Sequence, residues 1–249
     1  MFWRFGGYAG VSAVDSLLDK PDVSLEEILD EPEVIQELTQ KNNKLIEYLR
    51  EDHVLKRLMD YVTAPSLVNE DDDTSESTDE KTAADGDQQA EGQEKTPDPL
   101  KEALDPEDLE RAEGNRLRHA YIACELLASE TWSILESIML NQDHLRDFWG
   151  FLKRPPALDP LQASYFTKVN ETLLDHKTEE MLGFIRSLDG AVPSILQHID
   201  SPMIMDLLLK IISLEKIEGG QGTVDVSYYY NRELLRPLDD LYADFRVST

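Results

Sequence analysis

Residues 126–138 read LLASETWSILESI, and residues 173–185 read LLDHKTEEMLGFI. The two stretches lie 47 residues apart and share a leucine pair, a threonine, a leucine and an isoleucine at the same places. Each copy reads as the end of one helix, a break and the start of another helix. A period of about 40–47 residues with two or three helices per unit is typical of HEAT and armadillo arrays. Such arrays are more often binding scaffolds than enzymes, although a match at a few positions in one pair can also arise by chance.

The composition indicates a soluble helical protein with a strong negative charge. Among 249 residues, Asp and Glu number 51 against 24 Lys and Arg, which gives a net charge of −27. Nucleic acids and anionic lipids are bound mainly by Lys and Arg, so neither nucleic acid nor a membrane is expected as a partner. The longest apolar run, residues 203–212, is too short to span a bilayer. The single cysteine, Cys124, lies on the apolar face of an expected helix, where a buried thiol is typical.

Residues 1–64 are expected to form an N-terminal block of short helices, because apolar residues recur there at helical spacing between prolines. Ser24 and Glu27 match a capping box, in which each side chain accepts a hydrogen bond from the other residue's backbone amide. The apolar faces of the five expected helices start near Val11, Leu25, Val34, Leu45 and Val54.

Residues 65–98 are expected to be a disordered acidic insert. Residues 69–96 include eleven acidic residues, two basic residues and no large apolar side chain. Such a segment cannot offset the entropy that is lost on ordering. Ser77 and Thr82 each precede an acidic residue at the third position after them, as sites for acidophilic kinases do, and are candidate phosphorylation sites. The same spacing also arises by chance in acidic, serine-rich sequence.

Residues 99–216 are expected to form the helical-repeat region. The prolines at 155–156 and Pro160 force a connection between helices, because proline cannot donate a hydrogen bond and excludes the preceding residue from a helix. Thr178 is expected to be a helix N-cap, with acidic residues in the first turn after it.

Residues 217–249 differ in character and are expected to be a divergent or truncated tail. The sequence GGQG at 219–222 reads as a flexible joint. An alternating stretch at 224–230 could form a strand but has no partner strand, and no capping repeat closes the array.

No catalytic or metal-binding constellation is found in the sequence. The five histidines are far apart, and none stands in a His-x-Asp, His-Glu-x-x-His or Cys–His arrangement. Two-metal hydrolases need clustered Asp, His and Asn ligands, and phosphate loops need glycines followed by Lys and Ser or Thr. An enzyme is therefore the least favoured class, and no catalytic residue, metal or cofactor is expected.

Aromatic residues are the candidate contacts with a protein partner. Trp132, Trp149 and Phe151 belong to a group of aromatic residues between positions 132 and 166. Packing between stacked helices is the more common use of such residues, but Trp and Tyr also dominate interface hot spots. These three are therefore candidate partner-binding residues, with a core position as the alternative for each.

A second group of candidate contacts lies at the start of the chain. Phe2, Trp3, Arg4 and Phe5 precede every expected helix, and two glycines follow them directly. These residues either pack back onto the helices as a plug or contact a partner, and the sequence leaves both possibilities open.

Several stretches of the chain resemble one family of proteins. They are MFWRFG at 1–6, LEEILDE at 25–31, NKLIEYL at 43–49, RPP at 154–156, QASYFTKVNE at 162–171 and IMDLLLK at 204–210. In these stretches the chain resembles the N-terminal part of the SAPS family, the regulatory subunits of the protein phosphatase 6 type. The resemblance covers residues 1–64 and about 115–216 and is not seen beyond about Gly219. One departure is at Leu38 and Thr39, where the family commonly has Cys and Lys.

The resemblance implies an all-α, HEAT/armadillo-like helical array (an α-solenoid) without catalysis of its own. Such a scaffold would bind the catalytic subunit of a protein phosphatase 6-type serine/threonine phosphatase and direct its substrate choice in cell-cycle and signalling control. The resemblance also implies ankyrin-repeat or other adaptor proteins as further partners, and a cytoplasmic location with the nucleus as a second compartment. The alternative is a helical adaptor that binds other proteins without a phosphatase.

Overall fold

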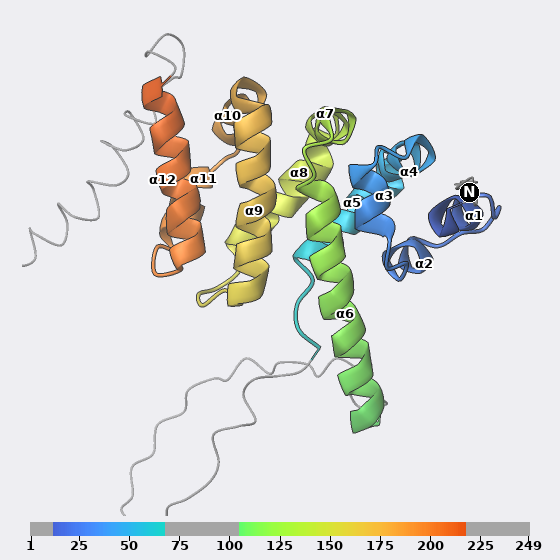
Figure 1. Ribbon diagram of the computed structural model, residues 1–249. Helices are drawn as coiled ribbons and strands as arrows, with labels where there is room; N and C mark the ends of the chain where they lie inside the picture. The colour runs from blue at the N-terminus through green and yellow to red at the C-terminus, as the bar shows by residue number, and fades with distance from the viewer. Residues whose placement is uncertain (1–11, 68–104, 218–249) are drawn as a thin grey trace, which may run out of the picture. The chain divides into compact units, whose positions relative to one another are not determined.

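A computed structural model of the chain describes residues 12–67 and 105–217 (Figure 1). Within these ranges the regular secondary structure is helical and no strand is present. The helices before the gap are α1 (Ala13–Leu18), α2 (Leu25–Leu29), α3 (Val34–Thr39), α4 (Asn43–Leu49) and α5 (Asp52–Val62). Those after it are α6 (Pro106–Leu127), α7 (Trp132–Leu140), α8 (Gln142–Trp149), the 3-10 helix η2 (Gly150–Lys153), α9 (Pro160–His176), α10 (Thr178–Ser187), α11 (Ala191–Leu196) and α12 (Pro202–Ile217). The expected all-α helical-repeat class is confirmed for the described residues.

The chain divides into two compact units, and the division falls inside α6. The larger unit contains the described residues 12–64 and 119–217, and it holds one continuous hydrophobic core. The smaller unit contains residues 65–67 and 105–118. In the smaller unit, Glu113 accepts hydrogen bonds from the Ser66 hydroxyl, the Leu67 amide and the Arg116 guanidinium. These bonds, led by the one from Arg116, lower the pKa of Glu113 to about 2.

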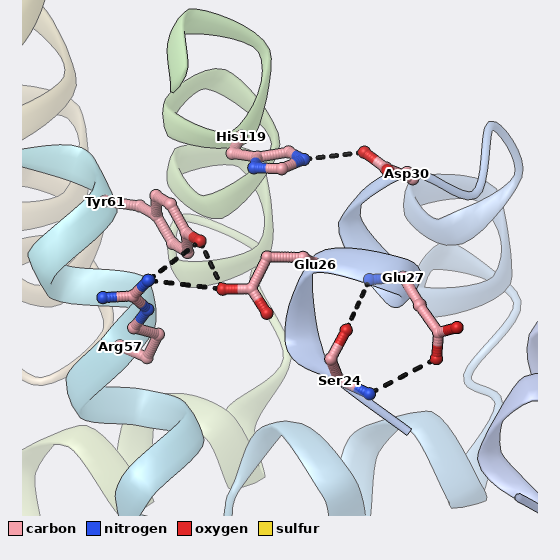
Figure 2. A network of polar contacts seen from close by, with 7 residues as sticks. All are labelled: Ser24, Glu26, Glu27, Asp30, Arg57, Tyr61 and His119. Atoms are coloured by element: carbon pink, nitrogen blue, oxygen red, sulfur yellow. Dashed lines mark hydrogen bonds and ion pairs between the residues drawn. The ribbon is translucent and has the colours of Figure 1, made fainter. Parts of the chain in front are cut away.

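Local signals in the sequence set the helix boundaries of the N-terminal block. Figure 2 shows the Ser24 capping box, in which the Ser24 hydroxyl accepts from the Glu27 amide at 3.2 Å and the Glu27 carboxylate accepts from the Ser24 amide at 3.4 Å. Asn42 caps α4 by accepting from the Leu45 amide, while its own amide group donates to Asp15 at 2.9 Å. The capping box predicted from the sequence is confirmed.

A polar network joins α2, α5 and the part of α6 that belongs to the larger unit (Figure 2). The Tyr61 hydroxyl donates to the Glu26 carboxylate, and the Arg57 guanidinium donates to the same carboxylate at 3.4 Å. His119 Nε2 lies 2.7 Å from an Asp30 carboxylate oxygen, and the His119 ring meets the Tyr61 ring edge-on at 5.4 Å. The bond from Tyr61 lowers the pKa of Glu26, and burial raises the pKa of Tyr61. The network therefore places α2 against the helices that follow it in the fold.

The two copies of the repeated sequence occupy equivalent places. In each copy the leucine pair closes a long helix, α6 or α9, and the later leucine and isoleucine lie on the next helix, α7 or α10. The side chains at all of these apolar positions are buried. Thr131 is the N-cap residue of α7, although its side chain makes no capping bond. Thr178 is the first residue of α10, so the predicted N-cap is wrong by one residue; the Thr178 hydroxyl donates to the Leu174 carbonyl instead.

Helix α9 lies between α12 and the α7 and α8 helices, and it packs against α5, α7, α10 and α12 (Figure 1). Pro160 is its first residue, and the Asp159 side chain caps it by accepting from the Gln162 amide at 2.8 Å. The connection predicted from the prolines is thus present between η2 and α9.

An aromatic cluster fills the core between α8, η2 and α9. The rings of Phe148, Trp149 and Phe151 surround Phe166, with ring centroids 4.9, 5.7 and 5.1 Å away. The Trp149 indole donates to the Asn170 side-chain oxygen at 2.8 Å, and the Asn170 amide group donates to the Phe166 carbonyl at 2.8 Å. Asn170 is fully buried, and both its oxygen and its nitrogen have partners in the core.

Cys124 lies in the core of the larger unit with none of its surface exposed. Burial raises the pKa of its thiol to about 12, so the thiol is neutral at physiological pH. The predicted buried thiol is confirmed. Of the helices in the described part of the chain, none combines the length and apolar character that a bilayer-spanning segment needs.

Other sequence predictions lie largely outside the described residues. The acidic insert with Ser77 and Thr82, and the tail with its alternating stretch at 224–230, fall in residues 68–104 and 218–249. The division into segments 1–64, 65–98, 99–216 and 217–249 stays a prediction.

We expect the substitution Asn170→Ala to lower the free energy of unfolding by about 1–3 kcal/mol, because it leaves the buried Trp149 indole N–H without an acceptor. Thr172→Ala, on the same helix, removes only an exposed hydroxyl bond to the Lys168 carbonyl and should change stability by less than about 0.5 kcal/mol. Guanidinium unfolding followed by circular dichroism measures both. Equal effects of the two substitutions would show that the buried bond contributes little.

Candidate protein-binding surface on α7

Helix α7 carries large apolar residues on its outer side as well as on its inner side. Its residues Ile134, Leu135 and Ile138 are buried in the core. Trp132 and Leu140 remain 63% and 73% exposed, the two largest exposures among the large apolar residues of the described part. Large apolar side chains that lie together on the surface often mark an interaction site, so the outer side of α7 is a candidate interface.

The Trp132 ring is held in place by a buried lysine. The Lys177 ammonium lies 4.3 Å from the centre of the Trp132 ring, a cation–π contact. Only 6% of the Lys177 side chain is exposed; its ammonium group binds the Glu136 carboxylate and lies 3.7 Å from that of Glu180. The lysine is therefore fixed by two carboxylates and in turn supports one face of the exposed indole.

Two grooves flank α7 within the larger unit. The first has a volume of about 810 Å³ and lies between α3, α4 and the connection from α6 to α7. Its apolar lining comes from Ile35, Leu38, Ile46, Ala128 and Trp132. The second has a volume of about 380 Å³ and lies between α7, the start of α8 and α10. Its apolar lining comes from Met139, Leu140 and Phe184.

The charged residues that line the two grooves are mostly acidic. Glu125 and Glu130 line the first groove together with Lys41, and Glu136 and Glu180 line the second. Glu125 is paired with Lys168, whereas Glu130 is 80% exposed and its carboxylate lies 3.9 Å from the His176 ring. The surface around α7 therefore combines apolar side chains with a negative rim.

Lys41, on the edge of the first groove, has a backbone conformation that usually belongs to glycine. Its φ of 60° is in the left-handed region, directly after the end of α3. The Lys41 amide donates to the Leu38 carbonyl, and the Asn42 amide donates to the Glu37 carbonyl at 3.0 Å. This pair of bonds is the Schellman motif, in which glycine is preferred because a Cβ atom is strained there.

The structure separates the sequence-predicted contact residues. Trp132 is exposed beside the first groove, as described above, whereas Trp149 and Phe151 are only 4% and 3% exposed and belong to the aromatic core. Both residues therefore pack in the core, which was the alternative to partner binding, and only a few per cent of their surface remains exposed. Phe2, Trp3, Arg4 and Phe5 lie outside the described residues. Partner binding by any of them stays a prediction.

The sequence analysis did not identify Leu140, Lys177 or Lys41 as residues of a candidate site. The signal for Leu140 was present, because the sequence WSILESIML at 132–140 has apolar residues on every side of a helix. Leu38 and Thr39, where the chain departs from the SAPS pattern, both line the first groove.

The charged groups in the rest of the described residues give no candidate metal site. Among the described residues, no group of three His, Cys, Asp or Glu side chains is placed to hold a metal ion. The Glu26, Arg57 and Tyr61 side chains bind one another and so are used within the fold (Figure 2). The α7 surface is thus the best candidate for a functional site. Its exposed apolar and charged side chains are suited to binding another molecule.

We expect Lys41→Gly to raise the free energy of unfolding by about 0.5–1 kcal/mol, because glycine adopts a positive φ without Cβ strain. Lys41→Ala is the matched control: it removes the same charge but keeps the Cβ atom, and should not stabilise the chain. Thermal unfolding of both variants tests this. Equal stabilisation by alanine would assign the effect to the lysine side chain and not to the backbone.

Comparison with known proteins places the chain in a family. The family model SAPS, described as SIT4 phosphatase-associated protein, matches residues 170–245. The Extragenic suppressor of kinetochore protein 1 of Schizosaccharomyces pombe is 38% identical over 250 residues, which covers 98% of this chain and 26% of that protein. The SIT4-associating protein SAP190 of Saccharomyces cerevisiae is 32% identical, over 90% of this chain and 24% of that protein.

A human protein named Serine/threonine-protein phosphatase 6 regulatory subunit 1 is 30% identical over 94% of this chain and 22% of its own length. The chain thus spans about a quarter of the length of these relatives. No solved structure matches it significantly.

These matches also correct one expectation. No resemblance was seen beyond about Gly219, but the family model continues to residue 245. The similarity therefore includes most of the tail. From the family model and from relatives that match nearly the whole chain, it follows that the chain belongs to the SAPS family.

Proposed function

We propose that this chain is a non-catalytic regulatory scaffold that binds the catalytic subunit of a protein phosphatase 6-type serine/threonine phosphatase and directs its substrate choice. The observation that carries the proposal is the similarity along 90–94% of the chain to proteins named for association with SIT4 or regulation of phosphatase 6. Because the chain spans about a quarter of those proteins, it supplies one part of their binding surface in this proposal.

The fold supports a role in binding. Stacked helices expose a continuous surface on which partners can be held side by side. A scaffold that holds a substrate and a catalytic subunit at once raises the local concentration of the substrate, and can change the rate of dephosphorylation without contributing a catalytic group. The exposed apolar side of α7, with its two grooves, is a surface suited to one such contact.

Further parts of the proposal concern cellular context. Ankyrin-repeat proteins or other adaptors are proposed as additional partners, and the cytoplasm and nucleus as the sites of action. A role in cell-cycle control fits the name of the Schizosaccharomyces pombe relative, which refers to a kinetochore protein.

A helical adaptor without a phosphatase partner is the second candidate. The observation that favours it is the departure from the family pattern at Leu38 and Thr39, both of which line the first groove.

The full 249-residue chain, tagged and expressed in human cells, should recover the catalytic subunit of phosphatase 6. Human phosphatase 6 regulatory subunit 1 serves as the positive control, and the tag alone as the negative control. If the regulatory subunit recovers the catalytic subunit and this chain does not, the phosphatase proposal fails for this chain and the adaptor candidate is favoured.

A further inference from the structure

We propose that the α7 surface is a binding site for a short linear segment of a client protein, in which two bulky apolar residues are flanked by lysine or arginine. This inference rests on the proposed scaffold function and names the kind of client that the scaffold would present. The site consists of Trp132, Leu140 and the grooves on either side of α7, as described above.

The size of the grooves favours a short segment over a folded domain. Volumes of about 810 and 380 Å³ hold a few side chains each. Trp132 and Leu140 are eight positions apart on one helix, which corresponds to about 12 Å along its axis. An extended segment spans about 13 Å in four residues, so side chains four residues apart could reach both grooves.

The Trp132 ring is already held in place by neighbouring side chains, so binding through it costs little conformational entropy. Lys177 is buried beneath the ring and held by Glu136 and Glu180, so the indole is restrained before any partner arrives. An anchor that is ordered in the free protein loses little further freedom when it binds. Exposed tryptophans of this kind are typical interface hot spots.

The negative charge of the chain favours lysine or arginine beside the apolar residues of the bound segment. Three of the four glutamates that line the grooves form ion pairs with Lys168 or Lys177, and the whole chain carries a net charge of −27. Glu130 is the most exposed of the four, at 80% of its side chain, so it is the carboxylate best placed to meet a cation from a bound segment. The same charge opposes a second copy of this chain on the surface, because two polyanions would repel each other.

The test uses the full chain and two labelled twelve-residue peptides. One peptide has two leucines four residues apart and two lysines at each end, with serine elsewhere; the other has glutamates in place of the lysines. Fluorescence anisotropy should show binding of the lysine peptide, at least tenfold weaker binding of the glutamate peptide, and weaker binding of the lysine peptide at doubled salt.

Three variants locate the site, with circular dichroism to confirm that each is folded. Trp132→Ala should weaken binding of the lysine peptide about tenfold or more, and Glu130→Gln should weaken it several-fold. Leu209→Ala, which truncates a 55% exposed apolar residue on α12 that lines neither groove, should leave it within twofold. Absent binding, equal binding of both peptides, or an unchanged affinity of Trp132→Ala would overturn the proposal.

If something other than a client segment occupies the α7 surface, the measurements will differ. Each of the following results would also overturn the proposal. Sedimentation that shows a dimer lost on Trp132→Ala would assign the surface to a second copy. Peptide binding that appears only after deletion of residues 1–11 would assign it to the chain's own aromatic N-terminus.

Recovery of the phosphatase separates this inference from the proposed function. If Trp132→Ala loses the peptide but still recovers the catalytic subunit, the client site is supported. If it loses both, the catalytic subunit itself occupies α7 and the client proposal is overturned. If the unaltered chain binds the peptide but never recovers the catalytic subunit, the proposed phosphatase function fails while the α7 site stands.

Discussion

The hydrogen bond from the Trp149 indole to the Asn170 side chain is the interaction on which the rest of the larger unit depends. A buried N–H group needs an acceptor, and Asn170 supplies one while its own amide group binds the Phe166 carbonyl. Helix α8 packs on α5 of the N-terminal block, and α9 packs on α12. One satisfied polar pair within an aromatic core therefore fixes the two helices that link the early and late parts of the fold.

The exposed side of α7 follows from this arrangement. With α9 fixed, Lys177, the residue directly after its end, lies against the Trp132 ring, and the core positions of α7 are filled by Ile134, Leu135 and Ile138. Trp132 and Leu140 are then on the outer side, where the described residues leave most of their surface exposed. A protein that acts by bringing others together needs surfaces of this kind, and the rigidity of the core gives this surface a defined shape.

Local signals predicted much of the fold, and long-range contacts account for what they missed. The capping box at Ser24, the proline connection before α9 and the buried Cys124 each depend on a few neighbouring residues, and all three are present. Trp132 and Trp149 looked alike in the sequence, because both lie at helical spacing among apolar residues. Only partners far along the chain distinguish them: Asn170 for the buried ring and Lys177 for the exposed one. The left-handed backbone conformation of Lys41 was not predicted for another reason: lysine rarely adopts a positive φ.

Hydrogen exchange of the Trp149 indole N–H tests most directly the claim that one shared core unites the larger unit. The intact chain is followed at increasing guanidinium concentration, and backbone amides of α5 and α12 are measured in the same samples. Our account predicts that the three sets of protons come to exchange through a single opening with one free energy. Separate opening of α5 and α12, with the Trp149 indole exchanging along with only one of them, would contradict it.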